Sequence, residues 1–581
     1  YEMLMSAKNC RLVFLSGTPI VKYPNEIAIL YNMLRGYIRS YSLPVKPKRG
    51  KKINELIIQK ILKKTLLVDF VKYNYGNNPT ITITRNPFGF VDRKNKNGDY
   101  KGISTNDRGL VDDNKFKELV IKSLEKNNID ADISNFKELE PQMAMPHTFK
   151  DFSKEFIDSD KGNGKMINKD KFHKRILGLT SYFRSAQESL LPEVFPKHED
   201  EYIEYCEMSN HQCNAYQEAR FAERKNEQES SKKRAKAKKA NMTVEELYGK
   251  MTSTYRVYSR SFCNFAFPDE IPRPMKGDAK TIEASVSDVN DEDDLDNITP
   301  EERLENMDGK YLEEDIDEFE DIDKKYKIKI NNALQAFKED GKKYLTPKGL
   351  KIYSPKFLSI LTKLIDVNQE YPGTHLIYSA FRTLEGIGLF ALTLEANGWS
   401  KFSITKTDNN GIKEYKIDIN GDELATKNIY GLYTGTETIE EKEIMRHVFN
   451  SEWDHPSIPL SMKKQLESIS SNNFNGNIIK AIMITSSGAE GITLKNTRYV
   501  HLMEPYWHPV RGDQVIGRAV RICSHKDLEQ EDRNVTIFKY IMKFSDVQIY
   551  GKPDSKIKDE QKPILDPEII EHDIDQFGNH I

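Results

Sequence analysis

The second half of the chain alternates short apolar runs with amphipathic stretches, which predicts strands and helices in turn. Apolar runs of strand length lie at 375–379, 430–433, 480–485 and 499–503. Stretches with helical spacing of apolar positions lie at 355–365, 384–397 and 437–449. Strands that alternate with helices indicate βαβ units and a parallel sheet, so we predict an α/β fold.

The first half gives a weaker pattern. Residues 11–15 are an apolar run that enters Ser16-Gly17-Thr18-Pro19, and we predict a buried parallel strand followed by a tight loop. Asn25 and Glu26 open a helix that Gly36 ends. Ile81–Thr84 alternate apolar and polar residues before the turn at 86–89, which predicts a hairpin.

Composition excludes some classes of protein but does not identify this one. The 581 residues carry a net charge of -2, with 38% hydrophobic and 30% charged residues, so several domains with real cores are expected. The five cysteines form no C-x-x-C pair, which argues against a disulfide framework and a zinc site. No apolar run reaches the length of a membrane span, and no signal peptide is visible.

The charge is unevenly distributed. Residues 232–239 are a basic run in a helical context, which is either a solvated face or a contact with nucleic-acid phosphates. Residues 287–323 are strongly acidic and predict a flexible linker or an interaction segment outside the core. Residues 91–170 are polar and rich in lysine and aspartate, so we interpret them as an insertion.

The strongest chemical signal is the sequence Q-x-x-G-R-x-x-R, formed by Gln514, Gly517, Arg518 and Arg521. On one helix face, two guanidinium groups at this spacing could point at one phosphate, as the arginine finger of an NTPase does. A solvated basic face is the alternative interpretation of these residues alone. Two other loops follow apolar strands, at 16–19 and at 485–492, and ligands of parallel sheets bind in such loops.

Taken together, the three segments resemble motifs III, V and VI of superfamily 2 helicases. The finer similarity is to the Swi/Snf-like branch, through the motifs at 15–26, 375–381, 433–450 and 505–509. The segments at 83–90 and 517–525 resemble the poxvirus-type helicases of large DNA viruses, which include nucleoside triphosphatase I and the helicase-like subunit of the early transcription factor.

This resemblance implies two RecA-like lobes, of which the first is partial and the second complete, with a mostly helical and partly disordered insertion. The expected divisions are part of the first lobe at 1–90, an insertion and inter-lobe helices at 91–270, an acidic linker at 271–340, the second lobe at 341–550 and a tail at 551–581.

The resemblance also assigns roles to residues. Arg521 is the expected finger, Arg518 its partner, and Gln514 the residue that orients the attacking water. The residues expected to contact ATP are Gly488, Glu490, Gly491 and Gly517. A second set of small and hydroxyl residues is expected to contact nucleic acid or to couple it to the nucleotide: Ser16, Gly17, Thr18, Thr485 and Ser486. Trp507 either stacks on a base or packs the lobe interface.

One part of the motif set is missing from the 581 residues. They contain neither G-x-x-x-x-G-K-[ST] nor Asp-Glu-x-His, the motifs that hold ATP phosphates and Mg²⁺ in the family. Both precede motif III, so we expect that the chain is truncated at its N-terminus, that the Mg²⁺ ligands lie upstream, and that this fragment alone is inactive.

The expected function is an ATP-dependent translocase or helicase in viral transcription, acting on DNA, with RNA as an open possibility. Expected partners are viral RNA polymerase or transcription factor subunits, and the expected location is the virion and the viral factory of the host cytoplasm. Two alternatives stay open: a non-catalytic nucleic-acid-binding or scaffold subunit, and a DNA-remodelling motor.

Overall fold

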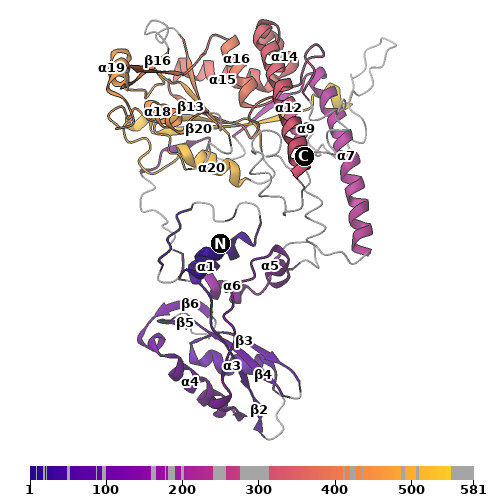
Figure 1. The fold of residues 1–581 in the computed structure, drawn as a ribbon, viewed down its shortest axis with the longest axis vertical. Coiled ribbons are helices and arrows are strands. Elements are labelled where there is room, and N and C mark those ends of the chain that lie inside the picture. The colour runs from indigo at the N-terminus through magenta and orange to yellow at the C-terminus, as the bar shows by residue number, and fades with distance from the viewer. Residues whose placement is uncertain are drawn as a thin grey trace. The chain divides into compact units, whose positions relative to one another are not determined.

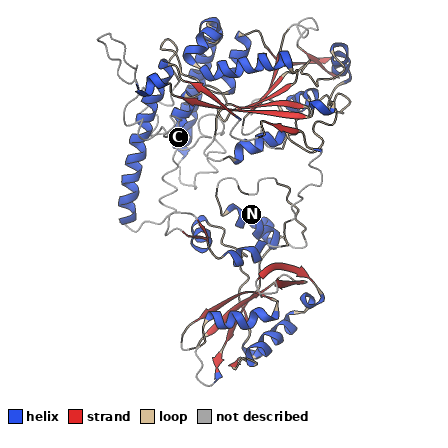
Figure 2. Ribbon diagram, turned by 180° about the vertical axis from the view of Figure 1, so that it is seen from behind, coloured by secondary structure: helices blue, strands red, loops and turns tan. Residues whose placement is uncertain are grey.

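The protein, described from a computed structural model, consists of two compact units, residues 1–184 and 185–581 (Figures 1 and 2). The structure describes residues 1–550 except for 8–9, 17–19, 21–22, 49–52, 77, 87, 95–99, 159–164, 177, 181–189, 198–201, 240–256, 275–312, 410–411, 419–426, 435–436, 486–490 and 506–508. The first unit holds the indigo and purple elements of Figure 1, and the second holds the magenta to yellow ones.

The first unit is built on an antiparallel sheet with the strand order β3-β4-β1-β8. Its strands are β3 (Val68–Asn74), β4 (Thr80–Arg85), β1 (Ser40–Pro44) and β8 (Lys137–Glu138). Side chains alternate between the two faces, as the period of a strand requires. One face is apolar and packs on α3 (Glu55–Leu62) and α4 (Asp113–Glu125), through Tyr41, Leu43, Val71, Ile81, Ile83, Phe116 and Val120.

The other face of this sheet is polar. Cross-strand register places Thr84 beside both Ser40 and Phe70, and Thr82 beside both Ser42 and Lys72. A separate small apolar cluster joins α2 (Glu26–Arg35), α5 (Phe149–Phe156) and α6 (Lys169–Ile176). The unit also contains three short antiparallel pairs of strands. They are β2 (Lys46–Pro47) with β7 (Ile129–Asp130), β9 (Ile157–Asp158) with β10 (Lys165–Met166), and β5 (Phe90–Lys94) with β6 (Tyr100–Thr105).

The predicted strand at 11–15 is wrong for this structure. Residues 11–15 form no strand or helix, with Val13 81% and Leu15 94% exposed. A parallel strand is stable only between neighbours that complete its hydrogen bonds, and no strand among the described residues lies beside this segment. The helix predicted after it is confirmed as α2, which Gly36 ends in the left-handed region at φ +71°.

The predicted hairpin at 81–89 is only half right. Ile81–Thr84 do form a strand, but β4 pairs with β3 before it and with β1. The segment after the turn, β5, pairs with β6. Residues 91–170, for which the sequence predicts a polar insertion, also contribute to the core of the unit, because Phe116, Val120 and Leu124 of α4 are fully buried.

The second unit is built on a parallel sheet of eight strands with the order β11-β20-β19-β13-β18-β17-β14, and β12 also pairs with β20. The predicted strands are all present: β13 (Thr374–Tyr378), β17 (Ile429–Tyr433), β18 (Ala481–Ile484) and β19 (Thr497–Leu502). Every residue of β13, β18 and β19 is buried. The sequence pattern did not indicate four further strands: β11 (Glu193–Phe195), β12 (Ile203–Glu207), β14 (Ser400–Lys401) and β20 (Asn534–Lys543).

Helices cover both faces of this sheet (Figure 2). Ile377, Met483 and Tyr499 pack in one apolar cluster with α14 (Pro347–Tyr353), α15 (Pro355–Glu370) and α16 (Ile387–Ala396). Their strand neighbours Leu376 and Ile482 pack in a second cluster with α18 (Ile439–Phe449), α19 (Leu460–Ile469) and α20 (Val510–Ala519). The hairpin of β15 (Ile404–Asn409) and β16 (Ile412–Ile417) packs beside α19.

The last part of the predicted acidic linker at 271–340 is a helix in the structure. Helix α12 (Glu313–Glu339) runs through the end of that segment. Tyr326, Ile330 and Phe337 are buried in the core beside α16. The acidic residues that dominated the sequence pattern lie before this apolar stripe, and residues 275–312 are outside the described part of the chain. The basic run at 232–239 lies in the helix α7 (Asn210–Lys239).

A chain of buried polar groups crosses the centre of the sheet. His375 Nδ1 lies 3.0 Å from His501 Nε2, and His501 Nδ1 lies 2.9 Å from the hydroxyl of Tyr540. Burial lowers the pKa of His501 to about 3, so its ring stays neutral at physiological pH. These hydrogen bonds satisfy polar atoms that would otherwise be costly inside an apolar core.

In the described part of the chain, no helix is both long enough and apolar enough to cross a membrane.

We predict that Phe337→Ala lowers the free energy of unfolding of the second unit by about 3–5 kcal/mol, because its fully buried ring contacts Phe265, Phe267 and Tyr344. The matched control is Ile328→Ala on the same helix, whose side chain is 59% exposed and whose loss should be nearly neutral. All three tryptophans, Trp399, Trp453 and Trp507, lie in the second unit, so urea denaturation followed by tryptophan fluorescence reports on this unit alone. Equal midpoints for the two variants would show that α12 does not belong to the core.

Candidate functional site

The carboxyl ends of four adjacent parallel strands meet at one edge of the second sheet. The loops that leave β17, β13, β18 and β19 therefore lie close together. Two of the three segments with predicted motifs, 485–492 and 514–521, follow β18 and β19 and so begin from this edge. The third segment, with Ser16, belongs to the first unit.

A buried carboxylate connects two of these loops. Glu504 follows β19 and is only 6% exposed. Its carboxylate accepts hydrogen bonds from the Ser379 hydroxyl at 3.1 and 3.0 Å and from the backbone N–H of Ala380, both directly after β13. Charge-assisted hydrogen bonds of this kind are stronger than neutral ones, so they fix the two strand ends relative to each other.

The same carboxylate reaches a third part of the chain. Asn264 Nδ2 donates to Glu504 at 2.9 Å, and Lys356 Nζ donates to Asn264 Oδ1 at 2.9 Å. Burial lowers the pKa of Lys356, whose side chain is 1% exposed. The sequence did not single out this network. Ser379 lies in the predicted motif at 375–381, but its contact with Glu504 was not predicted.

Helix α20 carries most of the predicted arginine motif. Val515 and Ala519, four residues apart, face the core of the unit and are fully buried. Gln514 and Arg518 have the same spacing on the neighbouring face and are half-buried. Gly517 has open space around its α-carbon, so packing does not require a glycine there.

Arg521 is not on the helix, contrary to the expectation that both arginines share one helical face. The helix ends at Ala519, and Val520 leaves the helical region with ψ 87°. The guanidinium of Arg521 folds back instead. Its Nε donates to the carbonyl of Gly517 at 3.2 Å, and its Nη1 donates to the hydroxyl of Thr493.

Thr493 belongs to the loop that follows β18, so this contact joins two of the predicted motifs. The backbone reinforces the junction, because Leu494 N–H donates to the carbonyl of Arg518 at 3.1 Å. On the other side of the loop, Asn450 Nδ2 donates to the carbonyl of Thr493 at 3.0 Å and Asn450 Oδ1 accepts from Lys495 N–H at 2.8 Å. The Arg521–Thr493 contact was not predicted, and no sequence signal pointed to Thr493.

Several predicted residues have a described position in these loops and others do not. Thr485 is fully buried at the end of β18. Gly491 has φ +76°, a backbone conformation that favours glycine. Gly17, Thr18, Ser486, Gly488, Glu490 and Trp507 lie outside the described residues, so their predicted roles stay predictions.

The chemistry of this edge suits an anion. Arg518 and Arg521 supply permanently charged guanidinium groups, and Gln514 supplies an amide that can donate or accept. The three residues lie within eight positions of each other, at the end of a helix that is anchored by its buried face. They fit the part of a nucleotide site that contacts phosphate, and the 581 residues contain no Walker-type loop to complete it.

Comparisons with known proteins confirm the resemblance to helicases. The model of the helicase conserved C-terminal domain matches residues 416–523, which include β17, β18, β19, α20 and Arg521. The putative ATP-dependent RNA helicase R350 of Acanthamoeba polyphaga mimivirus is 28% identical over 426 residues, 68% of this chain and 44% of that protein. The termination factor NPH-I homolog of African swine fever virus (isolate Tick/South Africa/Pretoriuskop Pr4/1996) is 25% identical over 446 residues, 74% of this chain and 51% of that protein.

Among solved structures, the crystal structure of the C-terminal part of the Fun30 ATPase domain matches 61% of this chain and 86% of that chain, with 15% identity and a TM-score of 0.30. The chain spans about half the length of the curated relatives that it matches. Residues 416–523 match the helicase conserved C-terminal domain, and viral proteins named as putative ATP-dependent RNA helicases and NPH-I termination factor homologues are among its relatives.

Proposed function

We propose that this chain supplies the second, nucleotide-responsive lobe of an ATP-driven nucleic-acid translocase or helicase in viral transcription, with Arg521 as its arginine finger. The observation that carries the proposal is the junction of Arg521 with Thr493, where the loop after β18 meets the end of α20. The helicase-domain match over the same residues supports it.

The proposed mechanism uses Arg521 and Arg518 as the groups that meet the γ-phosphate of ATP. Negative charge develops there during phosphoryl transfer, and fixed cationic donors stabilise it. Gln514 orients the attacking water. ATP with Mg²⁺ supplies the phosphoryl group and its counter-charge, and we place the Mg²⁺ ligands in sequence outside these 581 residues.

Thr493 is a positioning residue in this proposal. It holds the Arg521 guanidinium while the carbonyl of Gly517 holds the other side. Opening and closing of the lobes would move the protein along nucleic acid mainly through backbone phosphates, with little reading of sequence. We propose DNA as the track, with RNA as the alternative, and viral RNA polymerase or transcription factor subunits as partners in the virion and viral factory.

A second candidate is a non-catalytic subunit whose arginines serve a nucleotide held by another protein. The motif G-x-x-x-x-G-K-[ST] does not occur in the 581 residues, and an arginine finger can act on a nucleotide that another protein holds. The two candidates differ in whether the natural protein that contains this chain hydrolyses ATP by itself.

Arg521→Ala is expected to lower nucleic-acid-stimulated ATP turnover by about a thousandfold or more in the longest natural protein that contains this chain. ATP binding, measured by a fluorescent analogue, should survive because the finger acts mainly in the transition state. Arg521→Lys should stay impaired, since lysine lacks the planar fork. Lys526→Ala, an exposed change close to the same loop, is the control. If turnover is unchanged by Arg521→Ala, or is absent from the unsubstituted protein, the motor proposal fails.

Chain 1–581 alone should hydrolyse ATP no faster than a protein-free control, with or without single-stranded DNA. The reason is that it contains no loop of the kind that holds the phosphates. A phosphate-release assay in Mg²⁺ checks this. Hydrolysis above background that disappears with Arg521→Ala would overturn the expectation.

Thr493→Val should lower kcat of the natural protein roughly tenfold and leave KM nearly unchanged. The valine keeps the shape of the side chain but cannot accept the hydrogen bond from Arg521, so the guanidinium is less well positioned. Thr493→Ser retains the hydroxyl and should restore most of the turnover. Equal kcat values for the valine and serine variants would remove Thr493 from the mechanism.

A further inference from the structure

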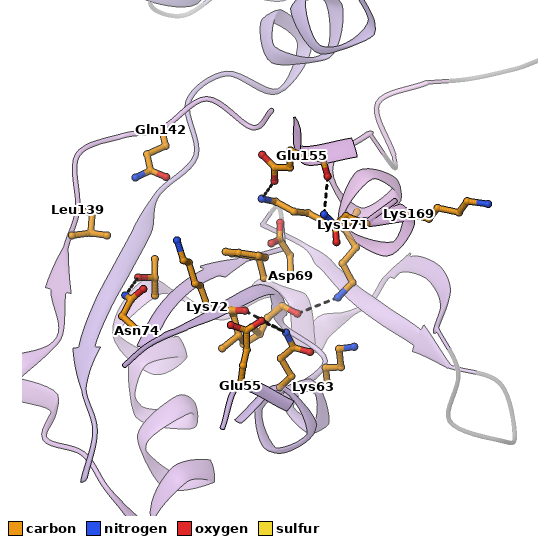
Figure 3. A pocket seen from close by; sticks show the side chains of 17 residues that line it. Glu55, Lys63, Asp69, Lys72, Asn74, Leu139, Gln142, Glu155, Lys169 and Lys171 are labelled. Carbon is orange, nitrogen blue, oxygen red and sulfur yellow. Dashed lines mark hydrogen bonds and ion pairs between the residues drawn. The ribbon is translucent and has the colours of Figure 1, made fainter. Parts of the chain in front are cut away.

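The polar face of the sheet in the first unit forms the floor of two adjoining hollows. An inner cavity of about 270 Å³ is lined by Ser40, Thr84, Lys171 and Arg175, among others. A wider groove of about 970 Å³ continues along β3 past Lys72 (Figure 3). The two share Phe70, Thr82, Gln142, Glu155 and Lys171, so they are parts of one depression.

Two buried polar groups that line the inner cavity have unused hydrogen-bonding capacity. Arg175 is 3% exposed; its Nη1 lies 3.0 Å from Asp69 and its Nη2 donates to Thr84 at 3.2 Å. Its Nε has no hydrogen-bond partner among the described residues. Ser40 is 1% exposed, and its hydroxyl likewise has no partner in the described part of the chain. Buried polar atoms without partners are rare in folded proteins, and an ion is one of the partners that can satisfy them.

The charges around this cavity do not balance. Asp69 is shared by two guanidinium groups, Arg175 at 3.0 Å and Arg35 at 3.3 Å. The other buried pair, Lys174 with Asp92 at 3.1 Å, is neutral, and Lys171 is neutralised by Glu155. The interior therefore carries one positive charge in excess, which is costly away from water unless an anion compensates it.

The outer groove adds cationic groups that are available from solvent. Lys72 and Lys169 are exposed and form no ion pair with any described residue. In Figure 3 the Lys72 side chain points from β3 into the hollow, below the linked pair Glu155 and Lys171. The groove also contains the ring of Phe70, with Lys171 Nζ 4.3 Å from its centroid.

We propose that the inner cavity binds a phosphate group, with Arg175 Nε and Ser40 Oγ as donors and with Lys171 and Lys72 along its entrance. A guanidinium and a hydroxyl suit a tetrahedral oxyanion, and the excess charge of the Asp69 cluster suits its negative charge. The phosphate comes either from a free anion or nucleotide, or from the backbone of a single-stranded nucleic acid that lies in the outer groove. The site belongs to the first unit and does not depend on the role proposed for Arg521.

The decisive variant is Ser40→Ala in chain 1–581. The hydroxyl has no partner among the described residues, so its removal should leave thermal stability unchanged while phosphate binding weakens about tenfold. Ser42→Ala is the matched control, because Ser42 lies two residues along the same strand, on the same face, and lines neither hollow. Binding of inorganic phosphate, ATP and an unstructured single-stranded DNA is measured by calorimetry for each variant.

Two further variants test the charge argument in opposite directions. Arg175→Lys keeps a positive charge for Asp69 but loses Nε, so phosphate binding should weaken, and a melting curve identifies any loss of folding. Glu155→Gln removes the carboxylate that neutralises Lys171, so phosphate binding should become several-fold tighter. A general loss of structure cannot produce this second effect.

The ligands separate the two sources of phosphate. Weakening of DNA binding by Ser40→Ala, with competition by inorganic phosphate, identifies a nucleic-acid backbone. Weakening for phosphate or ATP alone identifies a free anion. In both results Arg521→Ala should leave the Ser40-dependent binding intact, which separates this site from the proposed motor. If Ser40→Ala binds all three ligands as tightly as Ser42→Ala, the proposal is overturned.

Discussion

Complete burial of the central parallel strands is the constraint on which the second unit depends. Every residue of β13, β18 and β19 is buried, so both faces of the sheet must be covered by helices. The helices on one face of the sheet include α12, which comes from a segment rich in charged residues. The helices on the other face include α20. The arginine motif therefore has its place because Val515 and Ala519 are needed to close the core.

The two polar junctions at the strand ends have different physical characters. Glu504 is enclosed by Ser379, Ala380 and Asn264 and behaves as a permanent link between strand ends. The contact of Arg521 with Thr493 involves half-buried side chains near solvent. The hydroxyl of Thr493 takes only Nη1 of the guanidinium, so other N–H groups of Arg521 can meet an anion while this contact is kept. This edge of the sheet thus combines a buried carboxylate link with an arginine that is held in position near solvent.

The sequence predicted the second sheet well because its signals are local. Apolar runs such as 375–379 and 499–503 are strands with both faces buried, and length alone distinguishes them from helices. The same reasoning failed at 11–15, since an apolar run is a strand only where neighbours exist. It also missed the apolar stripe of α12, because acidic residues dominate the average over 271–340.

The candidate site was likewise predictable only where its signals are local in the sequence. Gln514, Arg518 and Arg521 could be found from their spacing, but the end of α20 at Ala519 could not, because no glycine or proline follows it. Thr493 and Glu504 matter through contacts with residues distant in the sequence, which no spacing rule encodes. The phosphate cavity has the same origin, since Ser40 and Arg175 are brought together only by the tertiary fold.

The exposed apolar segment at 11–16 has a consequence for the behaviour of the chain in solution. Val13, Phe14 and Leu15 expose apolar side chains and belong to no strand among the described residues, and a segment of this kind can add to a sheet edge of another molecule. No proline or charged residue interrupts 12–16. We therefore expect this segment of a few residues, remote in sequence from the helicase domain match at 416–523, to limit the colloidal stability of the isolated chain.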